Sequence, residues 1–182
     1  MSTATLNVTT VKADFPLLGR EVNGHPIVYL DSGATSQKPR QVLDALDRYY
    51  EEINANIHRG AYLIAEKATT AVEDSRAALA RFVGASAAEE IVFTKNATES
   101  INLVAHSWGR TNLSEGDVIL LTTHEHAATI VPWQQLAAER GGVFRWILLN
   151  DASCLDLTDL DQLLDGVRLV AVSAASNVLG TL

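Results

Sequence analysis

Residues that could hold an anion follow the first predicted strand of the chain. The string Asn96-Ala97-Thr98 opens a predicted helix, and free N–H groups at a helix N-terminus bind phosphate well. Ala97 is small enough to let a phosphate approach the backbone, and Thr98 adds a hydroxyl donor. The same string also fits an ordinary helix cap, because Glu99 stands three residues after Asn96. The residues therefore indicate either a phosphate site or a capping box.

Two histidines end the next predicted strand, in the string His124-Glu125-His126. Alternation along a strand would place His124 and His126 on the same side. A histidine at a strand end can stack on a flat ring or transfer protons, or it can simply be solvated. No third ligand lies nearby in the sequence, so we do not expect a metal site.

Two more polar positions could bind a ligand. Asn177 follows the last predicted strand, where its amide could bind a ligand oxygen or hold a turn. Arg59 stands in the string His58-Arg59-Gly60 between two predicted helices. Its guanidinium could bind a carboxylate or phosphate through two hydrogen bonds, or it could be a surface charge. Neither position is specific when taken alone.

The elements that must position these residues alternate between strand and helix. Apolar runs predict strands at residues 91–93, 118–121, 143–149 and 169–172. Helical spacing predicts helices near residues 39–53, 61–82, 98–108, 128–140 and 157–164, with Gly84 closing the second of them. This alternation indicates an α/β fold with a mostly parallel sheet flanked by helices. In such folds ligands bind at the carboxyl ends of the strands.

Composition narrows the class of function. The chain has 182 residues and a net charge of −8, and its basic residues are scattered, so we expect no nucleic-acid partner. No apolar run approaches the ~20 residues of a membrane span, and the N-terminus lacks a secretory signal, so a cytoplasmic protein is expected. The glycine loops of dinucleotide and P-loop proteins are missing, which disfavours a nicotinamide dehydrogenase.

Five strings occur in one order along the chain, at residues 29–39, 56–60, 93–104, 125–134 and 176–181. Together they resemble the SUF-type cysteine desulfurases and selenocysteine lyases, which are class V aminotransferases. The resemblance runs from about residue 13 to residue 182. It implies the large domain of a fold type I transferase with pyridoxal 5′-phosphate (PLP) as cofactor. It also implies a homodimer, L-cysteine or a related amino acid as substrate, and a SUF-type sulfur-acceptor protein that serves iron–sulfur cluster assembly.

The resemblance assigns roles to individual residues. Ala97 and Thr98 would bind the phosphate of PLP. His126 would stack on the pyridine ring and take part in proton transfer as the catalytic residue, and Asn177 would bond the phenolic oxygen. Three residues would line the substrate side: Ala34, His58 and Arg59.

The resemblance also implies residues that this chain does not contain. The Schiff-base lysine and the nucleophilic cysteine would lie beyond residue 182. Cys154 does not match that cysteine, and none of the four lysines matches that lysine: Lys12, Lys38, Lys67 and Lys95. We therefore expect residues 1–16 to be an N-terminal arm with a small-domain contribution, and residues 17–182 to be the first part of the PLP-binding domain. The chain alone would be inactive and poorly stable.

Some positions depart from the pattern of that family. Ala127 stands where relatives usually have a second histidine, and Ala174-Ala175 replaces a stretch that often includes one. The departures leave open another class V activity, such as a selenocysteine lyase, an epimerase or a kynureninase-like enzyme. A short paralogue that binds a partner or PLP without catalysis is the non-enzymatic alternative.

Overall fold

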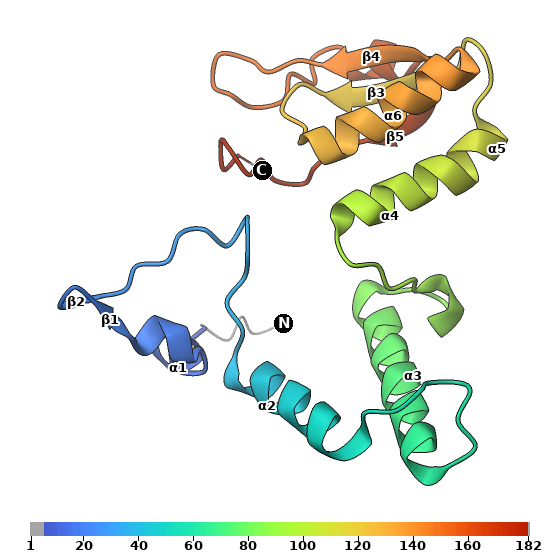
Figure 1. Ribbon diagram of the computed structural model, residues 1–182. Coiled ribbons are helices and arrows are strands. Elements are labelled where there is room, and N and C mark those ends of the chain that lie inside the picture. Colours follow the sequence, from blue (N-terminus) through green and yellow to red (C-terminus); the bar gives the residue numbers. More distant parts are fainter. Residues whose placement is uncertain (1–5, 182) are drawn as a thin grey trace. The chain divides into compact units, whose positions relative to one another are not determined.

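A computed structural model describes residues 6–181 of the chain. The chain divides into two compact units, Met1–Val92 and Phe93–Leu182, and Figure 1 shows their elements. No helix among the described residues is both long and apolar enough to cross a membrane.

The first unit is mainly helical. Its elements are α1 (Val8–Ala13), η1 (Pro16–Gly19), β1 (Glu21–Val22), β2 (His25–Pro26), α2 (Arg40–Arg48), the π-turn η2 (Tyr49–Ile53), α3 (Leu63–Val83) and η3 (Ala88–Glu90). β1 and β2 pair antiparallel around Asn23 and Gly24, whose φ angles of 54° and 77° suit a tight hairpin. Gly84 closes α3 with a φ of 73°, as a left-handed C-cap does.

The second unit holds a parallel three-stranded sheet with the order β4-β3-β5. The strands are β3 (Val118–Thr122), β4 (Val143–Ile147) and β5 (Val167–Ala171). Its helices are α4 (Ala97–Val104), the π-turn η4 (Ala105–Gly109), α5 (Arg110–Asn112), α6 (Ala127–Arg140) and α7 (Leu160–Leu164). The α/β fold with a parallel sheet is thus confirmed.

The core of this unit lies between the sheet and two helical segments. Ile119 and Leu121 alternate along β3 and are fully buried, and they pack with Trp133 and Leu136 of α6 and with the α4–η4 segment. A Cβ added at Gly109 would lie 2.5 Å from Leu136 Cδ2, so glycine allows the close approach of η4 to α6. This packing sets the N-terminus of α6 against the carboxyl end of β3.

One strand predicted from the sequence is wrong. Residues 91–93 are extended, but neither sheet of the described chain includes them. A sheet strand needs a neighbouring strand to pair with, and an apolar sequence alone does not provide that neighbour. The N-terminal arm expected at residues 1–16 stays a prediction. Residues 1–5 lie outside the described residues, and from Val8 the chain forms the exposed helix α1, capped by Asn7.

Candidate active site

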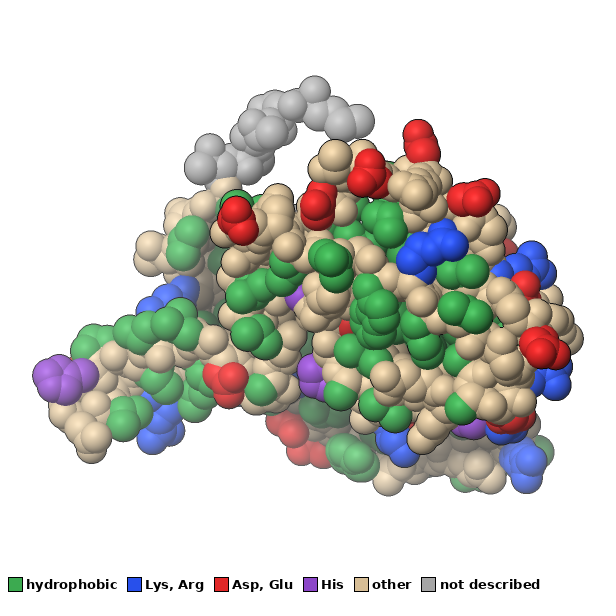
Figure 2. Space-filling model, turned by 90° about the horizontal axis from the view of Figure 1, so that it is seen from above, with side chains coloured by type: hydrophobic (Ala, Val, Ile, Leu, Met, Phe, Trp, Pro, Cys, Tyr) green, Lys and Arg blue, Asp and Glu red, His purple; other side chains and the backbone are tan. Residues whose placement is uncertain are grey.

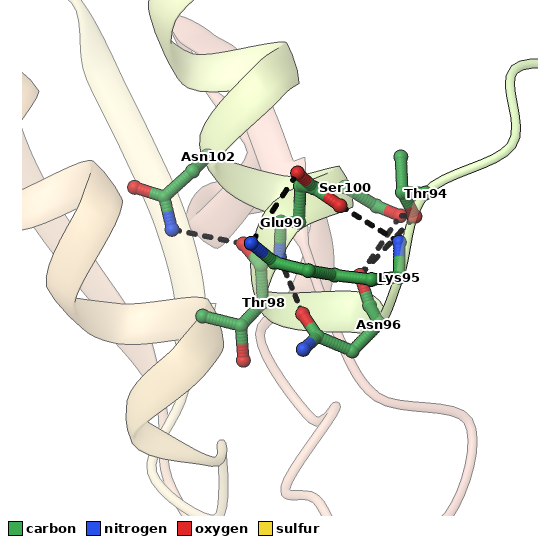
Figure 3. Close-up of polar contacts among 7 residues, drawn as sticks. All are labelled: Thr94, Lys95, Asn96, Thr98, Glu99, Ser100 and Asn102. Atoms are coloured by element: carbon green, nitrogen blue, oxygen red, sulfur yellow. Dashed lines mark hydrogen bonds and ion pairs between the residues drawn. The ribbon is translucent and has the colours of Figure 1, made fainter.

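Helix α4 begins with a side-chain cap. The Asn96 carboxamide oxygen accepts a hydrogen bond from the Glu99 N–H at 2.9 Å. The Glu99 carboxylate returns to the Lys95 N–H at 2.7 Å and lies 3.7 Å from the Lys95 ammonium. Figure 3 shows these contacts around the first turn. The capping alternative therefore holds, with Glu99 reaching Lys95 instead of the Asn96 N–H.

The cap leaves the donors needed for an anion unused. Within the described residues, the N–H groups of Ala97 and Thr98 and the Thr98 hydroxyl donate to no protein acceptor. In Figure 3 the Thr98 side chain points away from the Asn96–Glu99 contacts. Both residues are exposed. Capping and anion binding are therefore compatible at this helix, because they use different groups.

His126 is the N-cap of α6. Its Nδ1 accepts a hydrogen bond from the Ala128 N–H at 3.0 Å, while its side chain stays exposed. β3 ends at Thr122 and a turn follows it, so strand alternation does not govern His124 and His126. Both ring nitrogens of His124 are buried and have no hydrogen-bond partner among the described residues.

One cavity of about 580 Å³ joins the starts of both helices to the end of β5. Ala97 lines it from α4, His126 and Trp133 line it from α6, and Ser173 lines it from the segment after β5. Most of the remaining lining is apolar, from Ile101, Val104 and the 170–172 stretch. Concave sites with an apolar lining and a few convergent polar groups bind small molecules.

A buried carboxylate stands beside this cavity. Glu125 is 8% exposed and accepts hydrogen bonds from the Thr122 hydroxyl at 2.7 Å, the Ser173 N–H at 2.7 Å and the Ser173 hydroxyl at 2.6 Å. Burial raises the pKa of Glu125, but the hydrogen bonds from Ser173 and Thr122 together outweigh it, so the pKa lies below its ordinary value. The site residues expected from the sequence do not include Glu125 or Ser173. The signal in the sequence that could have indicated Glu125 is a single carboxylate a few residues after the apolar run at 118–121.

Asn177 lies four residues past Ser173 and is exposed. The preceding Ser176 is buried, and its hydroxyl accepts from the Leu179 N–H at 3.0 Å. Its own N–H donates to the Thr181 carbonyl at 2.9 Å. This turn fixes the backbone around Asn177, whose side chain has no hydrogen-bond partner within residues 6–181.

The three residues expected on the substrate side lie in the other unit. Ala34 is exposed in a turn in which its N–H donates to the Asp31 carbonyl at 3.1 Å. His58 has a φ of 61°, its N–H donates to the Thr69 hydroxyl at 3.0 Å, and its Nε2 lies 3.3 Å from the Glu73 carboxylate. Arg59 is exposed and forms no ion pair with any residue that the structure describes. His58 is thus held in a strained backbone conformation by two contacts, and the guanidinium of the next residue, Arg59, forms no ion pair within the described residues.

Other groups that could do chemistry are isolated. Cys154 is exposed in the loop after β4. No group of three His, Cys, Asp or Glu residues within 6–181 is arranged to hold a metal ion. Of the four lysines, only Lys95 lies in the second unit, and it does not line the cavity.

Comparison with known proteins identifies the family of this chain. A family model described as aminotransferase class-V matches residues 28–182. The chain belongs to the class-V aminotransferase family. Enzymes of this family, including the cysteine desulfurases, depend on PLP.

Several relatives of this class-V chain are cysteine desulfurases. A probable cysteine desulfurase from Synechocystis sp. is 51% identical over 172 residues, which cover 94% of this chain and 41% of the relative. The apo structure of the cysteine desulfurase from Thermococcus onnurineus NA1 matches with a TM-score of 0.83 and 40% identity, covering 97% of this chain and 42% of that one. The cysteine desulfurase CsdA from Escherichia coli gives 0.80 and 34%, covering 97% and 43%. The chain thus spans about two fifths of the length of these relatives.

Proposed function

We propose that the protein carrying this chain is a PLP-dependent cysteine desulfurase. It would break the C–S bond of L-cysteine, release alanine and leave the sulfur on an enzyme thiol as a persulfide. The observation that carries the proposal is that one cavity is lined both by Ala97, at the start of α4 where N–H donors are unused, and by His126. The cysteine desulfurases found among the relatives support it.

The chemistry of the donors fits PLP. Two backbone N–H groups and the Thr98 hydroxyl match the acceptor oxygens of a phosphate dianion, and the N-terminus of α4 favours negative charge. The Lys95 ammonium beside Glu99 offsets the one carboxylate in that turn. His126 offers a flat ring at the mouth of α6, and Asn177 offers a free amide for the phenolic oxygen. When bound, PLP supplies an electron sink for negative charge on the substrate.

The residues of the chain would have separate tasks. Ala97 and Thr98 hold the phosphate, and His126 both packs against the ring and moves a proton as the catalytic residue. Arg59 binds the substrate carboxylate through its fork of N–H donors, and His58 fixes the loop that carries Arg59. Ala34 leaves space on the same substrate side.

The wider assignments belong to the same proposal. We place the protein in the cytoplasm as a homodimer that passes sulfur to a SUF-type acceptor for iron–sulfur clusters. Residues 1–16 would be an arm with a small-domain contribution, and 17–182 part of the PLP-binding domain. Residues 1–182 alone would be inactive, because none of the four lysines matches the Schiff-base lysine of the family.

The test measures products from the full-length protein that contains this chain. Incubation with L-cysteine and a thiol reductant should give alanine and sulfide in equal amounts, and a preparation of residues 1–182 should give neither. PLP bound without alanine formation would exclude desulfuration and leave another class V activity. Failure to bind PLP would overturn the cofactor assignment as well.

A further inference from the structure

Glu125 is a charged group in a place where charge is costly. Its side chain is 8% exposed, and a buried carboxylate is tolerated only when hydrogen bonds replace its water. Both of its oxygens are engaged: Oε1 accepts from the Thr122 hydroxyl and the Ser173 N–H, and Oε2 accepts from the Ser173 hydroxyl. No ammonium or guanidinium is among these donors, so neutral hydroxyl and N–H groups supply the hydrogen bonds to the carboxylate.

The carboxylate joins two strands where their ladder stops. The last backbone pair between β3 and β5 is Leu121 with Ala171. Beyond that pair the two chain segments separate, β3 into the turn before α6 and β5 into the loop before Asn177. Glu125 and Ser173 lie 48 positions apart, and the two hydrogen bonds between them continue the connection past the ladder.

Both segments that the carboxylate joins carry groups of the cavity. His126 follows Glu125 directly and caps α6. Ser173 itself lines the cavity and leads into the Ser176 turn that fixes the backbone of Asn177. One side chain thus bridges the His126 side and the Ser173 side of the cavity.

We propose that Glu125 is the positioning residue of this cavity, and that its carboxylate holds the His126 and Ser173 segments at the separation the bound cofactor requires. The proposal rests on the proposed function for the identity of the cofactor. Glu125 itself would touch neither cofactor nor substrate. Its influence would pass through the hydrogen bonds to Ser173 and Thr122.

The test compares variants of the full-length protein. Glu125→Met keeps the length of the side chain and removes both acceptors. Glu125→Gln is the conservative variant, because its oxygen can still accept from the Ser173 N–H and its amide nitrogen can donate to the Ser173 hydroxyl. Glu139→Met is the matched control, since Glu139 lies on α6 with an exposed side chain.

Two measurements separate positioning from stability. The first is the dissociation constant of PLP at a temperature at which every variant is folded. We expect it to rise about tenfold or more in Glu125→Met and to stay within about threefold in Glu125→Gln and in Glu139→Met. The second is amide hydrogen exchange of the PLP-free protein, in which the Ser173 amide should lose protection in Glu125→Met while that of Leu120 in β3 does not.

Unchanged PLP affinity of folded Glu125→Met, with a protected Ser173 amide, would overturn the proposal. If that variant does not fold, Ser173→Ala removes one donor and keeps the backbone contact. It should weaken PLP binding severalfold, and Ser173→Thr should restore it; equal affinity of both variants and wild type would be the contrary result. Wild-type protein that binds no PLP would refute the proposed function, whereas the exchange measurement would still test Glu125.

Discussion

The Thr98 hydroxyl is the side-chain donor that the α4 cap leaves unused. We expect Thr98→Val to raise the dissociation constant of PLP about five- to tenfold, because it removes one hydrogen bond to a charged phosphate and leaves both N–H groups in place. Equilibrium titration of the full-length protein with PLP measures this.

Thr70→Val is the control for Thr98→Val. Thr70 is an exposed residue of α3 in the first unit, so the same loss of a hydroxyl there should leave PLP affinity unchanged. Equal affinities for the Thr98→Val variant and the wild type would mean that the Thr98 hydroxyl does not bind the phosphate.

The Glu125 carboxylate should make folding sensitive to acid. Its pKa is 4.5 in an unfolded chain and lower in the folded protein, so its contribution to stability is complete above that value. As the pH falls below 4.5 the unfolded state takes up a proton before the folded state does, and the contribution is lost by the time the pH has fallen through the folded pKa. As the pH falls below 4.5 the urea midpoint of the wild type should therefore fall more steeply than that of Glu125→Gln. Parallel pH profiles would contradict a lowered pKa.

Some site residues could be read from the sequence and others could not. The spacing around Asn96 and the strand end at His126 predict groups that face one edge of a parallel sheet, and the cavity does bring Ala97 and His126 together. Glu125 could not be found in this way, because its partner Ser173 is remote in the sequence. Ala34, His58 and Arg59 stay predictions as far as their role is concerned.

The loop that enters α3 depends on a glycine. A Cβ at Gly60 would lie 2.2 Å from the Cβ of Ala65, a fully buried residue of that helix. Gly60→Ala should therefore lower the free energy of unfolding by about 1–3 kcal/mol, the usual cost of forcing an extra carbon into a packed contact. Urea denaturation measures the change.

Gly19→Ala is the matched control for this substitution. Nothing lies within 4 Å of a Cβ placed at Gly19, and neither glycine has a positive φ. The control should change stability by less than about 0.5 kcal/mol. A Gly60→Ala protein as stable as the control would show that the 56–60 loop can move away from α3.

The local sequence pattern predicted most helices and strands. It failed where strand pairing, a change of helix type or a short hairpin decided the structure. The strands β3, β4 and β5 and the helices α3 and α6 lie close to their predicted ranges. The predicted strand at 91–93 is missing because periodicity identifies an apolar segment but not its neighbour in a sheet. The helix predicted at 98–108 changes to a π-turn at Ala105, which hydrophobic spacing does not reveal. The β1–β2 hairpin was missed even though its Asn23-Gly24 turn signal is in the sequence.

Residues 1–182 as a separate preparation expose large apolar side chains in both units. Leu30 is 91% exposed, Phe82 85% and Val178 82%, and Figure 2 shows hydrophobic side chains over much of the visible surface. Contiguous exposed apolar surface promotes association. We expect this preparation to aggregate or to bind a hydrophobic dye strongly, as judged by size-exclusion chromatography and dye fluorescence. A monomeric chain with a single sharp thermal transition would refute this.

The hydrogen bond from the Ala128 N–H to His126 Nδ1 has a consequence for the tautomer of that ring. A nitrogen that accepts a hydrogen bond carries no hydrogen, so the neutral imidazole must keep its hydrogen on Nε2. The neutral ring therefore offers its Nε2–H as a hydrogen-bond donor, while its basic nitrogen, Nδ1, is the one engaged in the cap of α6. One imidazole thus caps the helix whose Trp133 and Leu136 lie in the core of the second unit.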